Sequence, residues 1–221
     1  MMRKILTNFL YLFGLPKSIY VCLRLCRLKD AIRLPIIVSH KTKLDDLSGS
    51  VSFGKIKPGI VRIGFGSVET FDFSYQRTIL HVSGHIHFNG KSKIGKSSRI
   101  SVAGELVLGE NFHISAGGTI ISRKKITIGK NTLMAWDSLI TDADHHHILD
   151  QEGRITNPPA EVSIGNQVWI GARSMILKGA EIANGSIIGA QSLVSGKFRE
   201  DRCLIAGNPA RKLKKDVYWQ E

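Results

Sequence analysis

Near the C-terminal end of the chain, an aliphatic residue recurs at every sixth position. The series is Ile164, Ile170, Ile176, Ile182, Ile188 and Val194. In five of the six cases the next residue is small, namely Gly165, Gly171, Ala183, Gly189 and Ser195. This spacing differs from the 3.6-residue period of an amphipathic helix, so it indicates a sequence repeat of another kind.

The same spacing appears earlier in the chain, in shorter runs separated by slips of two residues. The runs are Val82, Phe88, Ile94, Ile100 and Leu106; then Leu108, Ile114, Ile120 and Ile126; then Ile128, Met134 and Ile140. The repeat therefore covers about residues 82–196. Residues 47–80 contain VSFGKIKPGIVRIGFGS, and we expect irregular strands there that continue the same stack.

A repeat of this length is one short strand followed by one turn, and three such units close a triangular coil. The aliphatic side chain points inward and the small residue eases the corner. One unit cannot bury its own isoleucine, but stacked coils can, with about 1.5–3 kcal/mol from each buried side chain. The chain is therefore predicted to be all-β. Its pattern resembles the hexapeptide-repeat, left-handed parallel β-helix.

Between Ile140 and Val162 the period is lost, and this gap contains TDADHHHILD over residues 141–150. A non-repeating segment that leaves a rigid coil is a typical location for function. We therefore predict an extruded catalytic loop over residues 141–161. A neutral imidazole is suited to accept a proton near pH 7. In an extended segment neighbouring side chains point to opposite faces, so three adjacent histidines would not share one metal ion.

The first residues of the chain combine apolar runs with strong positive charge. The formal net charge of the protein is +13, and residues 1–43 contribute +8 of it. The basic residues of this segment are Arg3, Lys4, Lys17, Arg24, Arg27, Lys29, Arg33, Lys41 and Lys43, and its one acid is Asp30. Pro16 interrupts the apolar run, which is too short to span a bilayer as a simple helix. We expect a helical segment that either lies on a membrane surface or caps the core.

The predicted organisation is an N-terminal segment over 1–46, a β-helix domain over 47–205 and a basic tail over 206–221. The three cysteines, Cys22, Cys26 and Cys203, have no paired spacing, which favours free thiols in a reducing compartment and no zinc site. Only the positive charge of the chain suggests nucleic-acid binding. The sequence contains no recognisable nucleic-acid-binding motif, so no such partner is expected.

The stretch VSIGNQVWIGARSMILKGAEIANGSIIGAQSLV, followed by IAGNPARKLKK, resembles the C-terminal half of hexapeptide-repeat sugar O-acetyltransferases. The polysaccharide-type enzymes are the nearest group, together with galactoside and maltose acetyltransferases, and the resemblance covers about residues 90–215. It implies a homotrimer that holds acetyl-CoA between neighbouring β-helices and acetylates a saccharide hydroxyl without a metal ion. The implied location is cytoplasmic, with residues 1–43 as a potential contact to the inner face of the membrane.

The resemblance also implies roles in the acceptor site. The sequence DADHHHI at residues 142–148 matches the family's catalytic segment best with His146 as general base. Asp142 or Asp144 would orient the imidazole or cap the turn, and the two neighbouring histidines remain alternative bases. Trp169 in the VWIG motif and Trp136 in LMAWDSLI would border the acceptor.

For the donor, Ala172 and Ala190 match the small residues beside the pantetheine arm. Ser195 matches a position that is Thr or Ser in the family, and the cofactor's phosphates would fall near Lys197, Arg211 and Lys214. Gly196 departs from the family, which usually has a lysine there. The Asn and Asp that hold the sugar in galactoside-type enzymes fall near Gly117 and Arg123. A galactoside-like acceptor therefore does not carry over, and a glycan or a lipid-linked saccharide is expected.

Other functions stay open on the sequence alone. N-acetylation of an amino-sugar would use the same donor site, whereas a purely structural β-helix would not need the extruded loop. The γ-type carbonic anhydrases share the fold and bind zinc through histidines of separate coils. Candidate histidines here are His81, His85, His87 and His113. The AGNPA and VWIG motifs favour acyl transfer over zinc chemistry.

Overall fold

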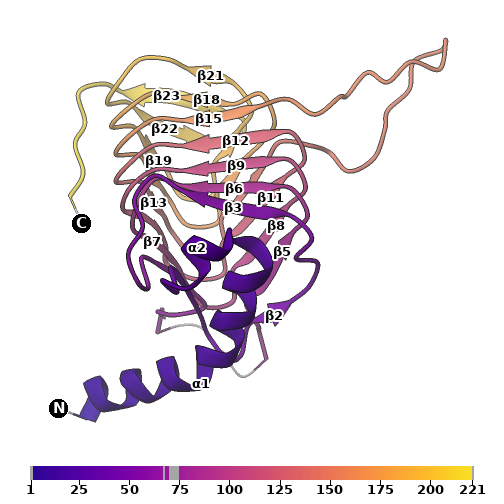
Figure 1. The fold of residues 1–221 in the computed structure, drawn as a ribbon. Helices are drawn as coiled ribbons and strands as arrows, with labels where there is room; N and C mark the ends of the chain where they lie inside the picture. Colours follow the sequence, from indigo (N-terminus) through magenta and orange to yellow (C-terminus); the bar gives the residue numbers. More distant parts are fainter. Residues whose placement is uncertain (1, 67, 70–74, 221) are drawn as a thin grey trace.

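The computed structural model describes residues 2–66, 68–69 and 75–220, and these residues form a three-sided coil of short strands (Figure 1). The chain passes from one sheet to the next at each corner, so neighbouring strands within a sheet come from successive coils. The strands pair in parallel, except for the antiparallel pair β22–β23 near the C-terminus. The prediction of an all-β, left-handed parallel β-helix is confirmed.

We call the three faces sheets A, B and C. In spatial order, sheet A contains β1 (Ile36–Val38), β4 (Val61–Ile63), β7 (Ser92–Ile94), β10 (Phe112–Ile114), β13 (Leu133–Met134), β16 (Trp169–Ile170), β19 (Ile187–Ile188), β22 (Leu204–Gly207) and β23 (Ala210–Lys214). Sheet B contains β2 (Lys43–Leu44), β5 (Ile79–Val82), β8 (Arg99–Val102), β11 (Thr119–Ser122), β14 (Leu139–Thr141), β17 (Met175–Ile176) and β20 (Leu193–Val194). Sheet C contains β3 (Ser50–Phe53), β6 (His85–Phe88), β9 (Glu105–Leu108), β12 (Lys125–Ile128), β15 (Val162–Ile164), β18 (Glu181–Ile182) and β21 (Lys197–Phe198).

The core is a set of aliphatic columns that run along the inside of the coil. The six residues of the strict repeat are all buried, with at most 4% of their surface exposed. They stack in register on successive coils, as Ile170 does on Ile188 and Ile176 on Val194. The hydrophobic repeat therefore reflects burial between stacked coils, as predicted, because each side chain is covered by those of the neighbouring coils.

The slips of two residues reflect the length of one corner. In the coils between β5 and β12, a residue pairs with the one twenty positions later, as Val82 does with Val102. In the last coils the offset is eighteen, as for Ile170 with Ile188. The two additional residues lie at the corner between sheets B and C. Gly84 is one of them, and a Cβ atom there would lie only 2.1 Å from the carbonyl oxygen of Gly104.

The N-terminal segment is helical and covers the open end of the first coil (Figure 1). Helix α1 spans Met2–Leu25 and α2 spans Leu28–Ala31. The backbone N–H of Val38 in β1 donates to the hydroxyl of Ser18 at 2.8 Å, and the Lys17 ammonium donates to the carbonyl of His40 at 2.6 Å. Gly14 allows this close approach, because a Cβ atom there would lie 2.2 Å from the Val38 carbonyl oxygen. The helix thus seals the core.

Two boundaries of the coil bear on the functional site. The stack of strands begins at Ile36, before residue 47, and the hairpin of β22 and β23 continues it beyond residue 205. Strand β14 ends at Thr141 and β15 begins at Val162, so the chain between them is free to leave the coil. Among the described residues, no helix has both the length and the apolar character needed to cross a membrane.

Candidate active site

The segment between β14 and β15 leaves the coil at the corner between sheets B and C and projects away from it (Figure 1). Its tip is a narrow hairpin closed by an antiparallel bridge between Leu149 and Ile155. The three histidines lie near the base of this loop, on the outgoing strand. The loop is therefore held by the coil at its base, while its tip stands free in one protomer.

A buried carboxylate fixes the base of the loop. Asp142 is fully buried, and its Oδ1 accepts the backbone N–H of Arg123 at 2.7 Å. Its Oδ2 accepts the N–H of Lys124 at 2.9 Å and the hydroxyl of Ser122 at 3.0 Å. The Asp142 carbonyl also accepts the N–H of Ala160, on the returning strand, at 3.0 Å. Asp142 thus ties both strands of the loop to the preceding coil, and among the described residues its carboxylate has no hydrogen bond with a histidine.

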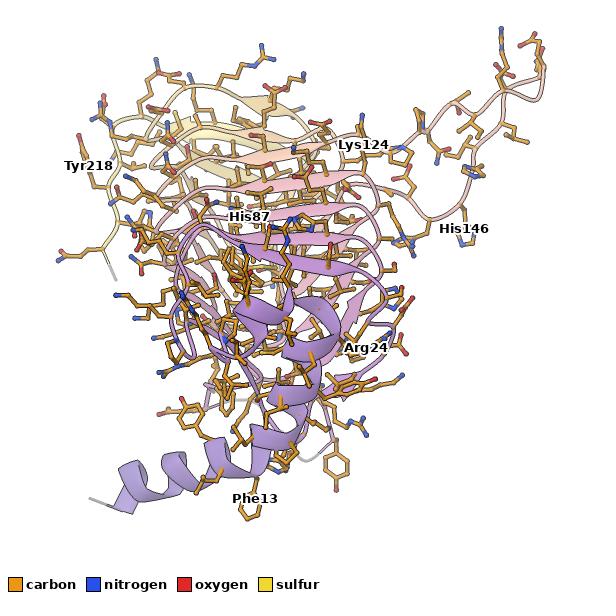
Figure 2. The ribbon with its side chains drawn as sticks, in the orientation of Figure 1. Phe13, Arg24, His87, Lys124, His146 and Tyr218 are labelled. Atoms are coloured by element: carbon orange, nitrogen blue, oxygen red, sulfur yellow. The ribbon has the colours of Figure 1, made fainter. Side chains whose placement is uncertain are left out.

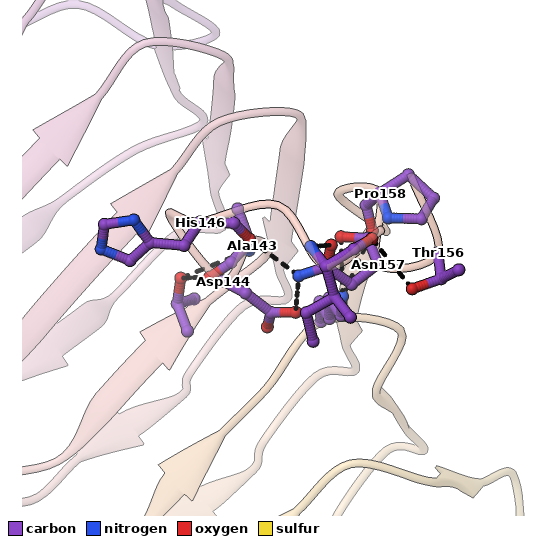
Figure 3. A network of polar contacts seen from close by, with 9 residues as sticks. Ala143, Asp144, His146, Thr156, Asn157 and Pro158 are labelled. Carbon is purple, nitrogen blue, oxygen red and sulfur yellow. Dashed lines mark hydrogen bonds and ion pairs between the residues drawn. The ribbon is translucent and has the colours of Figure 1, made fainter. Parts of the chain in front are cut away.

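A second cluster lies just beyond this anchor (Figure 3). Oδ2 of Asp144 accepts the Nζ of Lys178 at 2.5 Å and the Nδ2 of Asn157 at 2.9 Å. The ammonium also donates to the Asn157 carbonyl at 3.0 Å. The hydrogen bonds from Lys178 and Asn157 lower the pKa of Asp144 below its usual value. The carboxylate therefore stays ionised under mildly acidic conditions, and the cluster weakens only as the pH falls through that lowered pKa.

The side chain of Asn157 joins the two strands of the loop. Its Nδ2 donates to the carbonyl of His146 at 2.8 Å, and its Oδ1 accepts the N–H of Ile148 at 2.6 Å. Sequence reasoning did not identify Asn157 or Lys178, because they lie 13 and 34 positions from Asp144 and carry no spacing signal. They hold the loop segment that carries the histidines.

The imidazole of His146 is exposed and points away from the cluster of Asp144 and Asn157 (Figure 3). Its ring has no hydrogen-bond partner among the described residues, whereas its backbone N–H donates to the Asp144 carbonyl at 2.8 Å. The expectation of an extended segment here is wrong, because His145 has a φ of 64° and the chain turns. Alternation of faces therefore does not separate the three imidazoles. A ring held by its backbone and open on its outer side can accept a proton from a molecule bound there.

The other histidines considered as zinc ligands are widely placed on the coil. His85 and His87 lie on β6, where the hydroxyl of Ser52 hydrogen-bonds to a ring nitrogen of each at 2.8 Å. His113 lies on β10, on a different sheet. Within the described ranges, no group of three or more His, Cys, Asp or Glu side chains is arranged to hold a metal ion.

The two tryptophans predicted to border the acceptor lie on other faces of the coil. Trp169 projects outward from sheet A with 38% of its surface exposed, and its ring centroid is 6.3 Å from that of Trp219. Trp136 lies in the corner between sheets A and B. Sheet A is the face opposite the corner from which the loop leaves. One protomer therefore does not bring His146 and Trp169 together.

The residues predicted for the donor also lie in separate places. Ala172 and Ala190 occupy the corner between sheets A and B in consecutive coils, where the N–H of Gln191 donates to the Ala172 carbonyl at 2.9 Å. Arg211 and Lys214 lie on β23, at the edge of sheet A.

Ser195 and Lys197 lie on the other side of the coil, near the loop's corner. Lys197 is already engaged, because its Nζ lies 2.6 Å from a carboxylate oxygen of Glu181. Together, Arg199 and Lys197 lower the pKa of Glu181 to about 2. A phosphate group at this position would have to compete with that carboxylate for the ammonium.

Comparison with known proteins identifies the family. Residues 161–196 match the family described as bacterial transferase hexapeptide (six repeats). A protein assigned to O-acetyl transfer in lipopolysaccharide biosynthesis in Escherichia coli (strain K12) is 33% identical, over 60% of this chain and 72% of that protein. The galactoside O-acetyltransferase of the same strain is 34% identical, over 52% of this chain and 56% of the enzyme.

The crystal structure of the polySia-specific acetyltransferase NeuO shares the fold, with a TM-score of 0.67 at 21% identity, over 89% of this chain and 83% of that one. The chain belongs to the hexapeptide-repeat acetyltransferase family, and it is an acyltransferase.

The two aspartates of the loop have different structural roles, which a pair of substitutions separates. Asp142→Ala leaves the partly buried N–H groups of Arg123 and Lys124 without their side-chain acceptor, at about 1–3 kcal/mol for each unsatisfied group. The Ser122 hydroxyl keeps a second acceptor, the Glu105 carbonyl at 2.9 Å. We expect a clear drop in the thermal midpoint measured by circular dichroism. Asp144→Ala removes an exposed contact and should leave that midpoint near the wild-type value. Equal decreases in the thermal midpoint of the two variants would contradict this assignment.

Proposed function

We propose that the protein transfers an acetyl group from acetyl-CoA to a hydroxyl group of a saccharide, with His146 as general base. The observation that carries the proposal is the loop itself. Two buried or hydrogen-bonded clusters fix its base, yet they leave the His146 ring exposed and unpaired within the described part of the chain. The named activities of the Escherichia coli relatives, both O-acetyl transfers, support the same chemistry.

In this mechanism a ring nitrogen of neutral His146 accepts the proton of the acceptor hydroxyl as its oxygen attacks the thioester carbonyl carbon. The tetrahedral intermediate then breaks its C–S bond. The imidazolium returns the proton to the leaving sulfur, which gives free coenzyme A and an acetyl ester. A positioned base contributes about 10²–10⁴-fold to such a reaction, and holding the two substrates together supplies much of the remainder.

The donor would lie along the corner of Ala172 and Ala190, where small side chains leave the backbone accessible to a pantetheine arm. Arg211 and Lys214 are exposed at the adjacent edge of sheet A and would approach the phosphates. The Lys197 ammonium would contribute only by leaving Glu181. Transfer to an amino group of an amino-sugar would use the same donor site and is the alternative reaction.

We expect His146→Ala to lower the turnover number to below about a hundredth of wild type, because the variant has no group to accept the proton. Matched variants His145→Ala and His147→Ala should keep most of the activity. The measurement is coenzyme A release with a mixture of saccharide acceptors, including an amino-sugar. Calorimetry with acetyl-CoA tests that each variant still binds the donor. If His146→Ala kept more than about a tenth of the wild-type turnover, the base would be a different residue.

We also propose that the active site forms between copies of the chain, in a homotrimer. The loop and Trp169 lie on opposite sides of one coil, so a second protomer is needed to bring a base to the tryptophan. The hairpin tip carries apolar side chains that nothing covers in one protomer, with Ile148 61% and Leu149 57% exposed. Burial of such a tip against a neighbouring chain would stabilise a ring of copies.

A complementation experiment tests this arrangement. His146→Ala and Trp169→Ala are each expected to be inactive alone. After mixed refolding in equal amounts, about a quarter of the sites in a randomly mixed ring would combine an intact loop with an intact sheet A. Activity should therefore return to about that fraction of wild type. If the mixture stayed as inactive as its components while still forming trimers, each site would belong to one chain.

The exposed side of the N-terminal helix has the composition of a surface that binds a membrane. One side of α1 packs on the coil, but its opposite side is also apolar, with Phe13 65%, Leu12 63% and Leu23 57% exposed. Figure 2 shows Phe13 pointing away from the coil. Exposed basic residues stand at the end of α1 and directly after it in the chain, namely Arg24, Arg27, Lys29 and Arg33. A helix that is apolar on both sides needs a second partner, and the adjacent cations favour an anionic lipid surface.

We therefore propose a cytoplasmic enzyme that is peripheral to the inner face of the membrane. The wild-type protein should sediment with vesicles that contain phosphatidylglycerol and much less with neutral phosphatidylcholine vesicles. The double variant Leu12→Ser/Phe13→Ser should lose this binding. The control Leu213→Ser/Tyr218→Ser changes exposed apolar residues at the other end of the coil and should bind like wild type. Equal binding by all three proteins would argue against the contact.

A further inference from the structure

A pocket of about 470 Å³ lies on the outer face of sheet A, below Trp169 and beside the C-terminal tail. Its floor is the outer surface of β10 and β13, and Trp219 of the tail forms part of one wall. The indole Nε1 of Trp219 donates to the carbonyl of Gln167 at 2.8 Å, which fixes this wall to the coil. The pocket is separate from the loop that carries the histidines of the same chain.

Among the residues that the structure describes, its lining is positively charged without a compensating acid. Lys91 and Lys93 are exposed at one end, and no aspartate or glutamate within residues 2–66, 68–69 and 75–220 lines the pocket. Neither lysine has an ion-pair partner among the described residues. Glu110 lies next to the lining in sequence, but its carboxylate is bound by Lys55 at 2.8 Å. The pocket thus offers two ammonium groups to a negatively charged ligand.

Side-chain amides form a row along the same pocket. Asn111, Asn131 and Gln167 occupy one corner of three consecutive coils, each with a φ between 52° and 59°. This left-handed conformation is one that asparagine tolerates better than most residues, which explains Asn111 and Asn131 at the corner. The Nδ2 of Asn111 donates to the Oδ1 of Asn131 at 3.0 Å. The row presents polar groups that can both donate to and accept from sugar hydroxyls.

The pocket is connected to the predicted acceptor position by the strand register. Lys93, His113, Leu133 and Trp169 are successive partners on neighbouring parallel strands. Their outward side chains therefore form one column, with steps of about 4.8 Å between strands. The cations lie at the lower end of this column, and the two indole rings lie at the upper end. A chain of sugar residues whose reacting unit reached Trp169 would extend over the pocket.

We infer that this pocket binds an acidic saccharide unit of the acceptor, one that carries a carboxylate or a phosphate group. The inference rests on the proposed function, because it specifies the acceptor of that reaction. The ammonium groups of Lys91 and Lys93 pair with the anion. The amide row hydrogen-bonds to the hydroxyls of the same or the next sugar, and the indole faces pack against the apolar faces of the rings.

The test compares two oligosaccharides that differ only in charge. An oligogalacturonide is the acidic probe, and its carboxyl-reduced form is the neutral control. Binding is measured by calorimetry on the full-length wild-type protein at two salt concentrations. We expect the acidic probe to bind about tenfold or more tightly than the neutral one, with a difference that shrinks as salt rises.

The double variant Lys91→Gln/Lys93→Gln should bring the affinity for the acidic probe down to that for the neutral one. The control Lys41→Gln/Lys43→Gln removes the same charge from exposed positions at β2 and the turn before it, and should bind like wild type. Equal wild-type binding of the two probes would overturn the inference. An unchanged preference in the pocket variant, or an equal loss in the control variant, would overturn it as well.

A phosphorylated oligosaccharide distinguishes the two anionic groups, because a preference for it over the oligogalacturonide would identify phosphate as the ligand. Coenzyme A release is recorded in parallel with all probes. Transfer to neutral saccharides alone would reject the acidic subsite and leave the acetyltransferase proposal in place. Absence of transfer to every saccharide, with acetyl-CoA still bound, would reject the proposed acceptor class, whatever the binding results.

Discussion

The structure depends on the burial of aliphatic side chains between successive coils. A single coil has three short strands, and alone it would leave its inner side chains open to water on both sides. Ile120 is completely buried because β8 and β14 carry Ile100 and Ile140 directly below and above it. Each coil is therefore stable only as part of the stack. The ends of such a stack need covers, and α1 supplies one of them through Val21, Cys22 and Leu25.

A regular stack has little freedom to build a site from its strands, because each inward position is already filled. The side chains of a functional site must therefore come from the corners or from segments that leave the coil. The loop between β14 and β15 is such a segment. The carboxylate of Asp142 holds its base on the coil through three hydrogen bonds. The corners contribute in another way. Left-handed residues recur at the same corner of three consecutive coils and line up the amides of Asn111 and Asn131.

The three-sided geometry also separates groups that must act together. A side chain on sheet A and a loop from the opposite corner cannot meet around one coil, so the proposed reaction needs two copies. Parallel coils in a ring would also carry their N-terminal helices at one end. The exposed apolar side of each α1 would then face the same way, which suits a flat lipid surface. The proposed assembly and the proposed membrane contact would thus share one symmetry.

The sequence by itself determined the coil, its inward columns and the extruded loop, because a local period decides which side chains point inward. It also predicted a helical N-terminal segment, with a cap and a membrane-surface helix as open alternatives, and the segment that contains His146. It did not predict Lys178 and Asn157 as the partners of Asp144, because those contacts join segments that only folding brings together. The buried role of Asp142, the turn at His145 and the pocket of Lys91 and Lys93 likewise came from the tertiary structure. Periodicity fixes the face on which a residue lies, but only the stacked coils decide which side chains from different turns become neighbours.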